Sequence, residues 1–264
     1  MNKKYLFAVL FMALLLPWNL VFASSQRDRT ESIFRAALRG LHYEVKAGIN
    51  IGGASPLPLP REIRKITNYS PTMCFSIEGN VVKWFGEKEK WGLMLGLRLE
   101  NKGMQTDARV KNYGMAYFGD GGELMEGYWT GMVRTKYRST LFTIPVLATY
   151  KVNKRLRLQF GPYVSFQTSG DFSGHVYEGY LRHIVPTGEK VDIKGENRQY
   201  YDFSDNLRTV QVGMQGGVNW KAFRHLTVSA DLTWGLSNIF KKDFKTITFN
   251  MYPIYLNVGF GYAF

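Results

Sequence analysis

The sequence predicts an all-β fold, an eight-stranded antiparallel up-and-down β-barrel, on the basis of two observations. First, eight stretches alternate large apolar residues with polar or small ones, which is typical of strands with two unlike faces. Second, the connections between these stretches are alternately short and long, as expected when a chain runs up and down around a barrel. The stretches are residues 42–52, 71–85, 91–102, 138–151, 155–168, 209–221, 225–238 and 252–264.

In the first three stretches, most of the charged residues lie on one face. Glu44 and Lys46 alternate with apolar residues in the first stretch, and the next two add Glu78, Arg98 and Glu100 on the polar face. If the GEKEK turn between the second and third stretches is a symmetric hairpin, Glu78 lies directly opposite Arg98.

The remaining stretches keep the period of two. The fourth is the least regular, because Leu141 and Phe142 put apolar side chains on both faces. The next three are cleaner, with Arg157 and Asp231 on their polar faces. The last continues the alternation to the final residue, Phe264.

The connections fall into two groups. Short turns, with the sequences GEKEK, VNK and KAFR, follow the second, fourth and sixth stretches. Long connections occupy approximately residues 53–70, 104–136, 169–206 and 239–251, and we expect them to be loops. With an even number of strands, both termini then lie on the short-turn side.

The two faces indicate which side of the barrel meets lipid. A soluble eight-stranded barrel of the lipocalin type would turn its apolar face inward. The other face carries many charged and amide side chains, and its exposure to a dry core would leave polar groups unpaired at about 1–3 kcal/mol each. We therefore expect a transmembrane barrel in the outer membrane, with short periplasmic turns, long extracellular loops, and lipid and lipopolysaccharide around it.

The amino terminus predicts export. Lys3 and Lys4 precede a short apolar run, and Ala23 precedes a polar break, which is typical of a cleaved signal peptide. The run is interrupted before the ~20 residues that a spanning helix needs, although an uncleaved anchor is the alternative. We predict a signal peptide at 1–23, a periplasmic leader at 24–40, either a short amphipathic helix or unstructured, and a barrel at 41–264.

Composition restricts the partners. The chain has 34 Lys and Arg against 21 Asp and Glu, which for an exported protein favours anionic partners such as lipid head groups and disfavours nucleic acid. Its one cysteine, Cys74, excludes an internal disulfide and is expected to point inward as an ordinary lumen residue.

Two stretches carry a family resemblance. Residues 143–166, TIPVLATYKVNKRLRLQFGPYVSF, and the pattern VQVGMQGGVNW, LTVSADLTWGLSNIF and LNVGFGYAF resemble the PorT-like outer-membrane β-barrel domain family. The resemblance implies the barrel fold. The family includes members tied to secretion, and it provides no catalytic residues that map onto this sequence. The terminal aromatic also resembles the signal that the barrel assembly machinery reads, here Tyr262 and Phe264.

We predict that the inward charges form a salt-bridged network that fills a narrow lumen, since eight strands enclose space for side chains only. An ion path with a small conductance is the alternative. The predicted network consists of Glu44, Lys46, Glu78, Arg98, Glu100, Arg157 and Asp231.

The long connections are the predicted binding regions, because aromatic residues and Arg are enriched at binding surfaces. The same residues also suit a membrane interface. A protein partner could bind there or at the periplasmic leader. The candidates are Tyr117, Tyr128, Trp129, Tyr177, Tyr180, Arg182, Tyr200 and Tyr201.

An enzymatic role is the second hypothesis. His175 and His183 could serve a lipid- or lipopolysaccharide-modifying enzyme, but no spacing marks a nucleophile with its base. The GDGGE sequence at 119–123 lacks the ligand series of a calcium loop. We predict no catalytic residues, metal site or cofactor. The leading hypothesis is a structural or partner-binding surface protein, accessory to secretion.

Overall fold

The computed structural model describes residues 40–118, 124–183, 187–188, 190–193, 198–244 and 246–264, and side chains at 115–118, 124–126 and 183 are outside the description. The predicted signal peptide and, apart from Gly40, the predicted leader lie outside the described residues, as does the GDGGE sequence.

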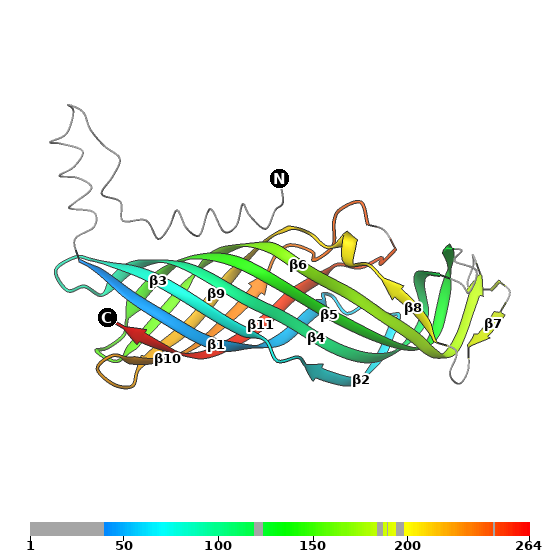
Figure 1. Ribbon diagram of the computed structural model, residues 1–264, viewed down its shortest axis with the longest axis horizontal. Helices are drawn as coiled ribbons and strands as arrows, with labels where there is room; N and C mark the ends of the chain where they lie inside the picture. Colours follow the sequence, from blue (N-terminus) through cyan, green and yellow to red (C-terminus); the bar gives the residue numbers. More distant parts are fainter. Residues whose placement is uncertain (1–39, 119–123, 184–186, 189, 194–197, 245) are drawn as a thin grey trace, which may run out of the picture. The chain divides into compact units, whose positions relative to one another are not determined.

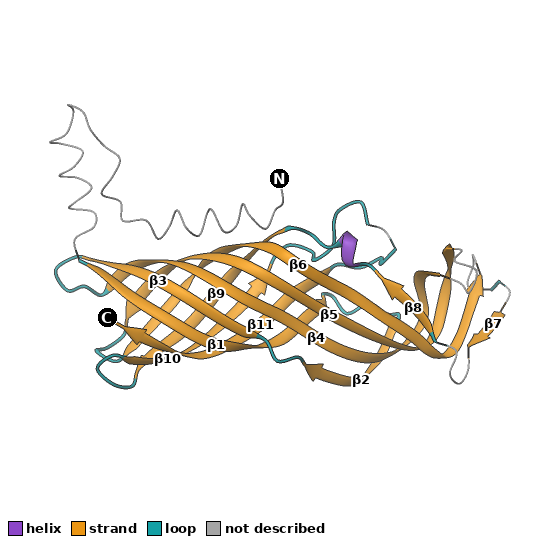
Figure 2. Cartoon of the chain, in the orientation of Figure 1, coloured by secondary structure: helices purple, strands orange, loops and turns teal. Residues whose placement is uncertain are grey.

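The described chain is almost entirely β-structure (Figure 2). Among the described residues, no helix is long and apolar enough to cross a membrane. The elements are β1 (Leu41–Pro56), β2 (Ile63–Pro71), β3 (Phe75–Phe85), β4 (Trp91–Phe118), β5 (Leu124–Lys151), β6 (Leu156–His183), β7 (Lys190–Ile193), β8 (Gln199–Asp202), the 3₁₀ turn η1 (Ser204–Asn206), β9 (Val210–Lys221), β10 (Leu226–Gly235) and β11 (Met251–Ala263).

Eight of these strands form a closed antiparallel ring, in the order β1, β3, β4, β5, β6, β9, β10 and β11 (Figure 1). The ring closes because β1 pairs with β11 from Glu44 opposite Ala263 to Pro56 opposite Met251. The eight ring strands correspond to the eight predicted stretches, so the fold prediction is confirmed. The carboxyl terminus lies at the short-turn end (Figure 1).

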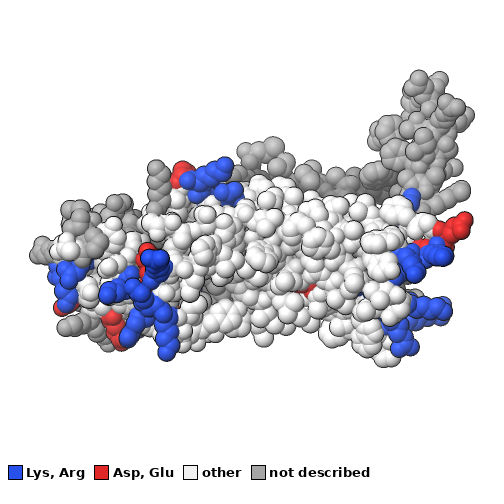
Figure 3. Space-filling view, turned by 180° about the vertical axis from the view of Figure 1, so that it is seen from behind, with Lys and Arg blue, Asp and Glu red and all other residues white. Residues whose placement is uncertain are grey.

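The two faces of the ring divide as the alternation predicts. On the outside, Val45, Ile77 and Leu95 are 44, 55 and 50% exposed, whereas Glu78 and Arg98 on the inside are 4 and 1% exposed. Figure 3 shows the consequence, a broad band of barrel surface with almost no charged side chains between two charged ends. The predicted hairpin register is also confirmed, since Glu78 pairs with Arg98 across β3 and β4.

The predicted loops at 104–136 and 169–206 are largely wrong. β4, β5 and β6 are each 28 residues long and continue well past the apolar band as one paired sheet. β7 and β8 pair with the far part of β6, and β2, inside the predicted loop 53–70, pairs with β4. This extension has its own apolar core, which explains why these segments are ordered as strands.

The glycines where β1 pairs with β11 provide a test of the ring closure. Gly259 faces inward opposite Gly48, and a Cβ there would press on the carbonyl oxygen of Ala47, whereas a Cβ at Gly79 on the lipid face meets nothing within 4 Å. We expect Gly259→Ala to destabilise the barrel by about 1–3 kcal/mol. Gly79→Ala is expected to be neutral or stabilising by about 0.4–1 kcal/mol.

Urea unfolding of both variants in lipid vesicles, with migration in unheated SDS gels as the check of folding, measures the difference. Equal midpoints for Gly259→Ala and Gly79→Ala would contradict the described closure between β1 and β11.

Candidate functional site

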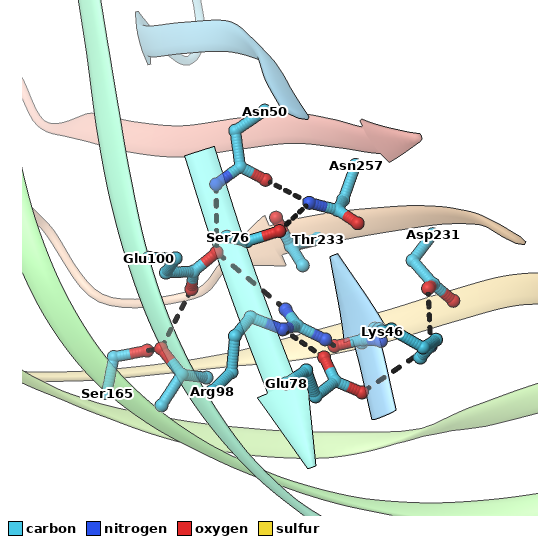
Figure 4. A network of polar contacts seen from close by, with 12 residues as sticks. Lys46, Asn50, Ser76, Glu78, Arg98, Glu100, Ser165, Asp231, Thr233 and Asn257 are labelled. Atoms are coloured by element: carbon cyan, nitrogen blue, oxygen red, sulfur yellow. Dashed lines mark hydrogen bonds and ion pairs between the residues drawn. The ribbon is translucent and has the colours of Figure 1, made fainter. Parts of the chain in front are cut away.

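A network of buried charges fills the middle of the barrel (Figure 4). Arg98 lies at its centre: Nε donates to Glu78, Nη2 donates to Gln215 Oε1 at 2.9 Å, and Nη1 lies 3.8 Å from Glu100. Lys46 links the far side, since its Nζ lies 3.4 Å from Glu78 and 3.1 Å from Asp231. β1, β3, β4, β9 and β10 thus all contribute to one cluster.

A second group surrounds Glu44 nearer the short-turn end. Arg157 Nη2 donates to Glu44 Oε2 at 2.5 Å. The other carboxylate oxygen accepts from Asn219 at 2.9 Å and from Thr227 at 2.8 Å. Between the two groups, Gln159 donates to Asp231. All seven predicted lumen residues therefore lie inside the barrel, in contact with one another or with neighbours in the same two groups.

The sequence prediction missed Lys102. Its Nζ lies 3.2 Å from Glu100 and 5.4 and 5.5 Å from the ring centroids of Tyr163 and Tyr255. Lys102 continues the inward even-numbered positions of β4, so the period of two was the signal that identifies it. With it, the cluster holds four carboxylates and four cations. We call this set the charged plug: Glu44, Glu78, Glu100, Asp231, Lys46, Arg98, Lys102 and Arg157.

Neutral side chains complete the plug. Thr143 donates to Glu100 at 2.8 Å and is 2.7 Å from Ser165. Asn50 also donates to Glu100, at 3.2 Å, and accepts from Asn257 at 2.8 Å. Buried charges are tolerated where opposite charges and hydrogen bonds compensate them, and the equal numbers of the two signs meet that condition.

A row of polar side chains lies on the outward face of the sheet extension. Asp107, Arg134, His175 and Tyr200 are successive partners across β4, β5, β6 and β8. Arg134 donates to both carboxylate oxygens of Asp107, at 2.6 and 2.9 Å. The His175 ring lies between Tyr177 and Tyr200, with centroids 5.6 and 5.4 Å away. We call these five residues the outer-face row.

Burial, hydrogen bonds and neighbouring charges at the outer-face row shift the pKa values of Asp107, Arg134 and His175. The hydrogen bond from Arg134 lowers the pKa of the Asp107 carboxyl, and the charge of Arg134 acts in the same direction. Burial lowers the pKa of His175, with further lowering by the charges of Arg198 and Arg134. His175 is therefore biased towards the neutral ring, flanked by two aromatic side chains.

The predicted loop residues separate into core and surface. Trp129 is 0% and Tyr201 7% exposed, so the expectation that they are displayed for binding is wrong for these two. Both belong to the apolar core of the extension, because their strand positions point inward. Tyr200, the strand neighbour of Tyr201, is 64% exposed, and Tyr177 is partly exposed.

The other candidates lie nearer the far end of the sheet. Tyr128, Tyr180 and Arg182 are partly exposed, and the Arg182 guanidinium lies 5.4 Å from the Tyr180 ring centroid. The side chain of Tyr117 is outside the described part of the chain.

The residues considered for catalysis are arranged differently from a nucleophile and its base. Ser173 donates to Asp171 at 2.7 Å, whereas the described contacts of His175 are with tyrosine rings. The side chain of His183 lies outside the described part. Cys74 is 4% exposed, with its sulfur 3.5 Å from the Thr72 hydroxyl.

The terminal aromatic residues lie on the outside of the short-turn rim. Tyr262 and Phe264 are 49 and 73% exposed and make an edge contact at 5.0 Å between centroids. His225 stacks on Tyr262 at 5.2 Å, and the backbone of Phe264 donates to Tyr43 at 3.0 Å. The chain end is thus fixed to both of its neighbouring strands.

The plug can be tested by removing its central cation. Arg98→Ala leaves Glu78 and Glu100 buried with fewer cations, so we expect a loss of about 3–5 kcal/mol in the free energy of unfolding. Arg138→Ala, on the exposed face of β5, is the control and is expected to change stability by about 0.5 kcal/mol or less. Denaturant unfolding in vesicles compares them, and similar unfolding midpoints would contradict a network that depends on Arg98.

The outer-face row predicts a dependence on acid. Because the folded pKa of Asp107 is lowered, its contribution to stability is present above the unfolded value of about 3.9 and is lost as pH falls through the folded value. The contribution is small, about 1 kcal/mol or less, since the Arg134 side chain is 38% exposed.

Hydrogen exchange of the outer parts of β4 and β5, compared between about pH 6 and pH 3, tests this dependence. Wild type should lose more protection in acid than Asp107→Asn, which lacks the titrating group. An identical acid response in the two proteins would show that the pair does not stabilise the sheet.

The family model described as "Outer membrane protein beta-barrel domain" matches residues 22–241. No curated protein matches the chain.

Among solved structures, the chain is similar to Ail of Yersinia pestis, the Neisserial surface protein NspA and the outer membrane protease OmpT of Escherichia coli. The identities are 10, 10 and 11%, and the TM-scores are 0.33, 0.32 and 0.37. The alignments cover 85, 85 and 86% of this chain and 97% of each other chain. Similarities at this level carry no argument about function. The family match over residues 22–241 does establish the family: the chain belongs to the outer membrane protein β-barrel domain family and is an outer-membrane protein.

Proposed function

We propose that this protein is a non-catalytic surface protein that binds a partner through the outward face of its extracellular sheet. The observation that carries the proposal is the length of β4, β5 and β6. Each has 28 residues, whereas about 9–11 suffice to cross the bilayer. The additional residues form an ordered sheet with a core of its own, which is a rigid platform for side chains outside the membrane.

The chemistry of the platform favours recognition. The outer-face row combines two tyrosines, an arginine and a neutral histidine, residue types that suit binding surfaces. The charge of Arg134 is compensated by Asp107, and Arg138 lies opposite Asp171 on the neighbouring strand. The row is therefore an aromatic surface with a few polar groups held by hydrogen bonds, and not a surface of one charge sign.

The charged plug supports a closed lumen over a conducting one. Its charges are balanced and cross-linked between strands, so an ion would have to displace ion pairs buried in a low dielectric. The small-conductance hypothesis gains no support from this arrangement, and neither does a lipid-modifying activity from the surroundings of His175.

Two further roles are proposed, one in secretion and one in membrane insertion. The PorT-like resemblance motivates an accessory role in secretion, with a protein partner at the extracellular sheet or at the periplasmic leader. Exposed Tyr262 and Phe264, at the end of the strand that closes the ring, support recognition by the barrel assembly machinery during insertion.

Site-specific photo-cross-linking on intact cells tests the binding face. A photoreactive amino acid at position 200 should give a discrete cross-linked product, and Tyr177→Ala together with Arg134→Ala should diminish it. The matched control is the same photoreactive residue at position 223, because Phe223 is an exposed aromatic, 72% against 64% for Tyr200, in the turn at the opposite end. Absence of a product at position 200, or a product unaffected by the two substitutions, would contradict the proposal.

A further inference from the structure

The barrel wall has a seam between β1 and β2. On one side, β1 pairs with β3 only as far as Ile49 opposite Phe75. On its other side, β1 stays paired with β11 as far as Pro56. β2 occupies the position above β3 but pairs with β4. In the described part of the chain, the hydrogen bond from Tyr69 Oη to the Gly52 carbonyl, at 2.7 Å, joins the two strands without a ladder.

An apolar cavity of about 400 Å³ lies behind this seam. The seam strands supply its front, and its inner wall is formed by side chains from the extensions of β4, β5 and β6 and from the segment before β11. Representative lining residues are Ile63, Met104, Ala108, Val133, Phe172 and Phe249. The volume lies in the range of small-molecule sites, about 300–1,000 Å³, and the lining matches an apolar ligand.

The surface around the seam is apolar as well. Ile51, Leu59 and Ile66 are 43, 57 and 53% exposed, and Met73 is 89% exposed. Ile51 and Phe75 belong to the lipid-facing band, so the seam lies at its outer boundary. An apolar molecule in the outer leaflet could therefore enter sideways without crossing water.

Two cations stand side by side on the outward face of the same wall. Lys65 of β2 is the direct partner of Arg109 of β4, and both are exposed. Like charges directly opposite in a sheet are destabilising, so this pair costs stability unless an anion lies against it. The wall of the cavity thus combines an apolar interior with a cationic exterior.

We propose that the cavity binds the aliphatic chain of an anionic amphiphile, which enters through the β1–β2 seam and leaves its carboxylate or phosphate against Lys65 and Arg109. A membrane lipid and a free fatty acid share this chemistry. The inference is independent of the partner-binding function, because neither the cavity lining nor the pair Lys65 and Arg109 belongs to the outer-face row.

The test uses the full-length protein in phospholipid vesicles and a fatty acid with a photoreactive diazirine in its chain. Labelling should be saturable, should map to cavity-lining segments of β4 and β5, and should be displaced by unlabelled fatty acid. Ala108→Phe fills the cavity and should abolish saturable labelling. Ala47→Phe places the same side chain on the lipid face and should leave it unchanged. Migration in unheated SDS verifies that both variants are folded.

A second pair of variants tests the charge without altering the cavity. Lys65→Ala with Arg109→Ala should weaken displacement by the fatty acid about tenfold and leave displacement by the matching fatty alcohol unchanged. A phospholipid carrying the same diazirine chain distinguishes the source: cavity labelling by it assigns a bilayer lipid, and labelling by the free acid alone assigns a soluble amphiphile. Labelling confined to lipid-facing residues, equal in both phenylalanine variants, would overturn the proposal.

Discussion

The ion pairs of Arg98 with Glu78 and Glu100 are the constraint on which the rest of the barrel interior depends. An eight-stranded ring leaves room inside for side chains only, and its inner face must be polar because the outer face is taken by lipid-facing apolar residues. Each inward charge therefore needs a partner from another strand. Arg98 meets this need for β3, β4 and β9 at once, while Lys46 extends the pairing to β10. The plug consequently fixes strand positions as well as filling space.

The interior changes character above the plug. Lys102 is its last cation, and its ammonium group lies against Tyr163 and Tyr255. The next inward residue of β4, Met104, belongs to the apolar core of the extension. Outside, the order is reversed, because lipid-facing apolar residues give way to Arg134 and its charged neighbours. The pairing of β4 with β5 continues across this boundary, and β5 stays paired with β6 past a register shift between Thr140 and Leu141, while the polar and apolar faces exchange sides.

That exchange explains what could and could not be predicted from the sequence. The register of Glu78 against Arg98 and the inward positions of Asp231 and Arg157 follow from alternation and one hairpin turn. Lys102 follows Glu100 by two residues, so the same alternation places it on the inward face of β4. The sequence does not predict the extension, because its apolar residues occupy the inward positions instead of the outward ones. They are also mixed with glycines and tyrosines, which gives these segments the composition of loops. The aromatic composition alone predicts surface positions for Trp129 and Tyr201, whereas their positions on the inward face place them in a core.

The exchange of faces also separates the two proposed binding surfaces of the protein. Within the membrane the inner side is polar and carries the charged plug. Beyond it the inner side is apolar, and its core leaves the cavity behind β1 and β2 unfilled. The outer side, now in water, is free to carry tyrosine, histidine and arginine together. A single sheet that crosses the membrane boundary thus places an apolar site and an aromatic, polar site on opposite sides of the same strands.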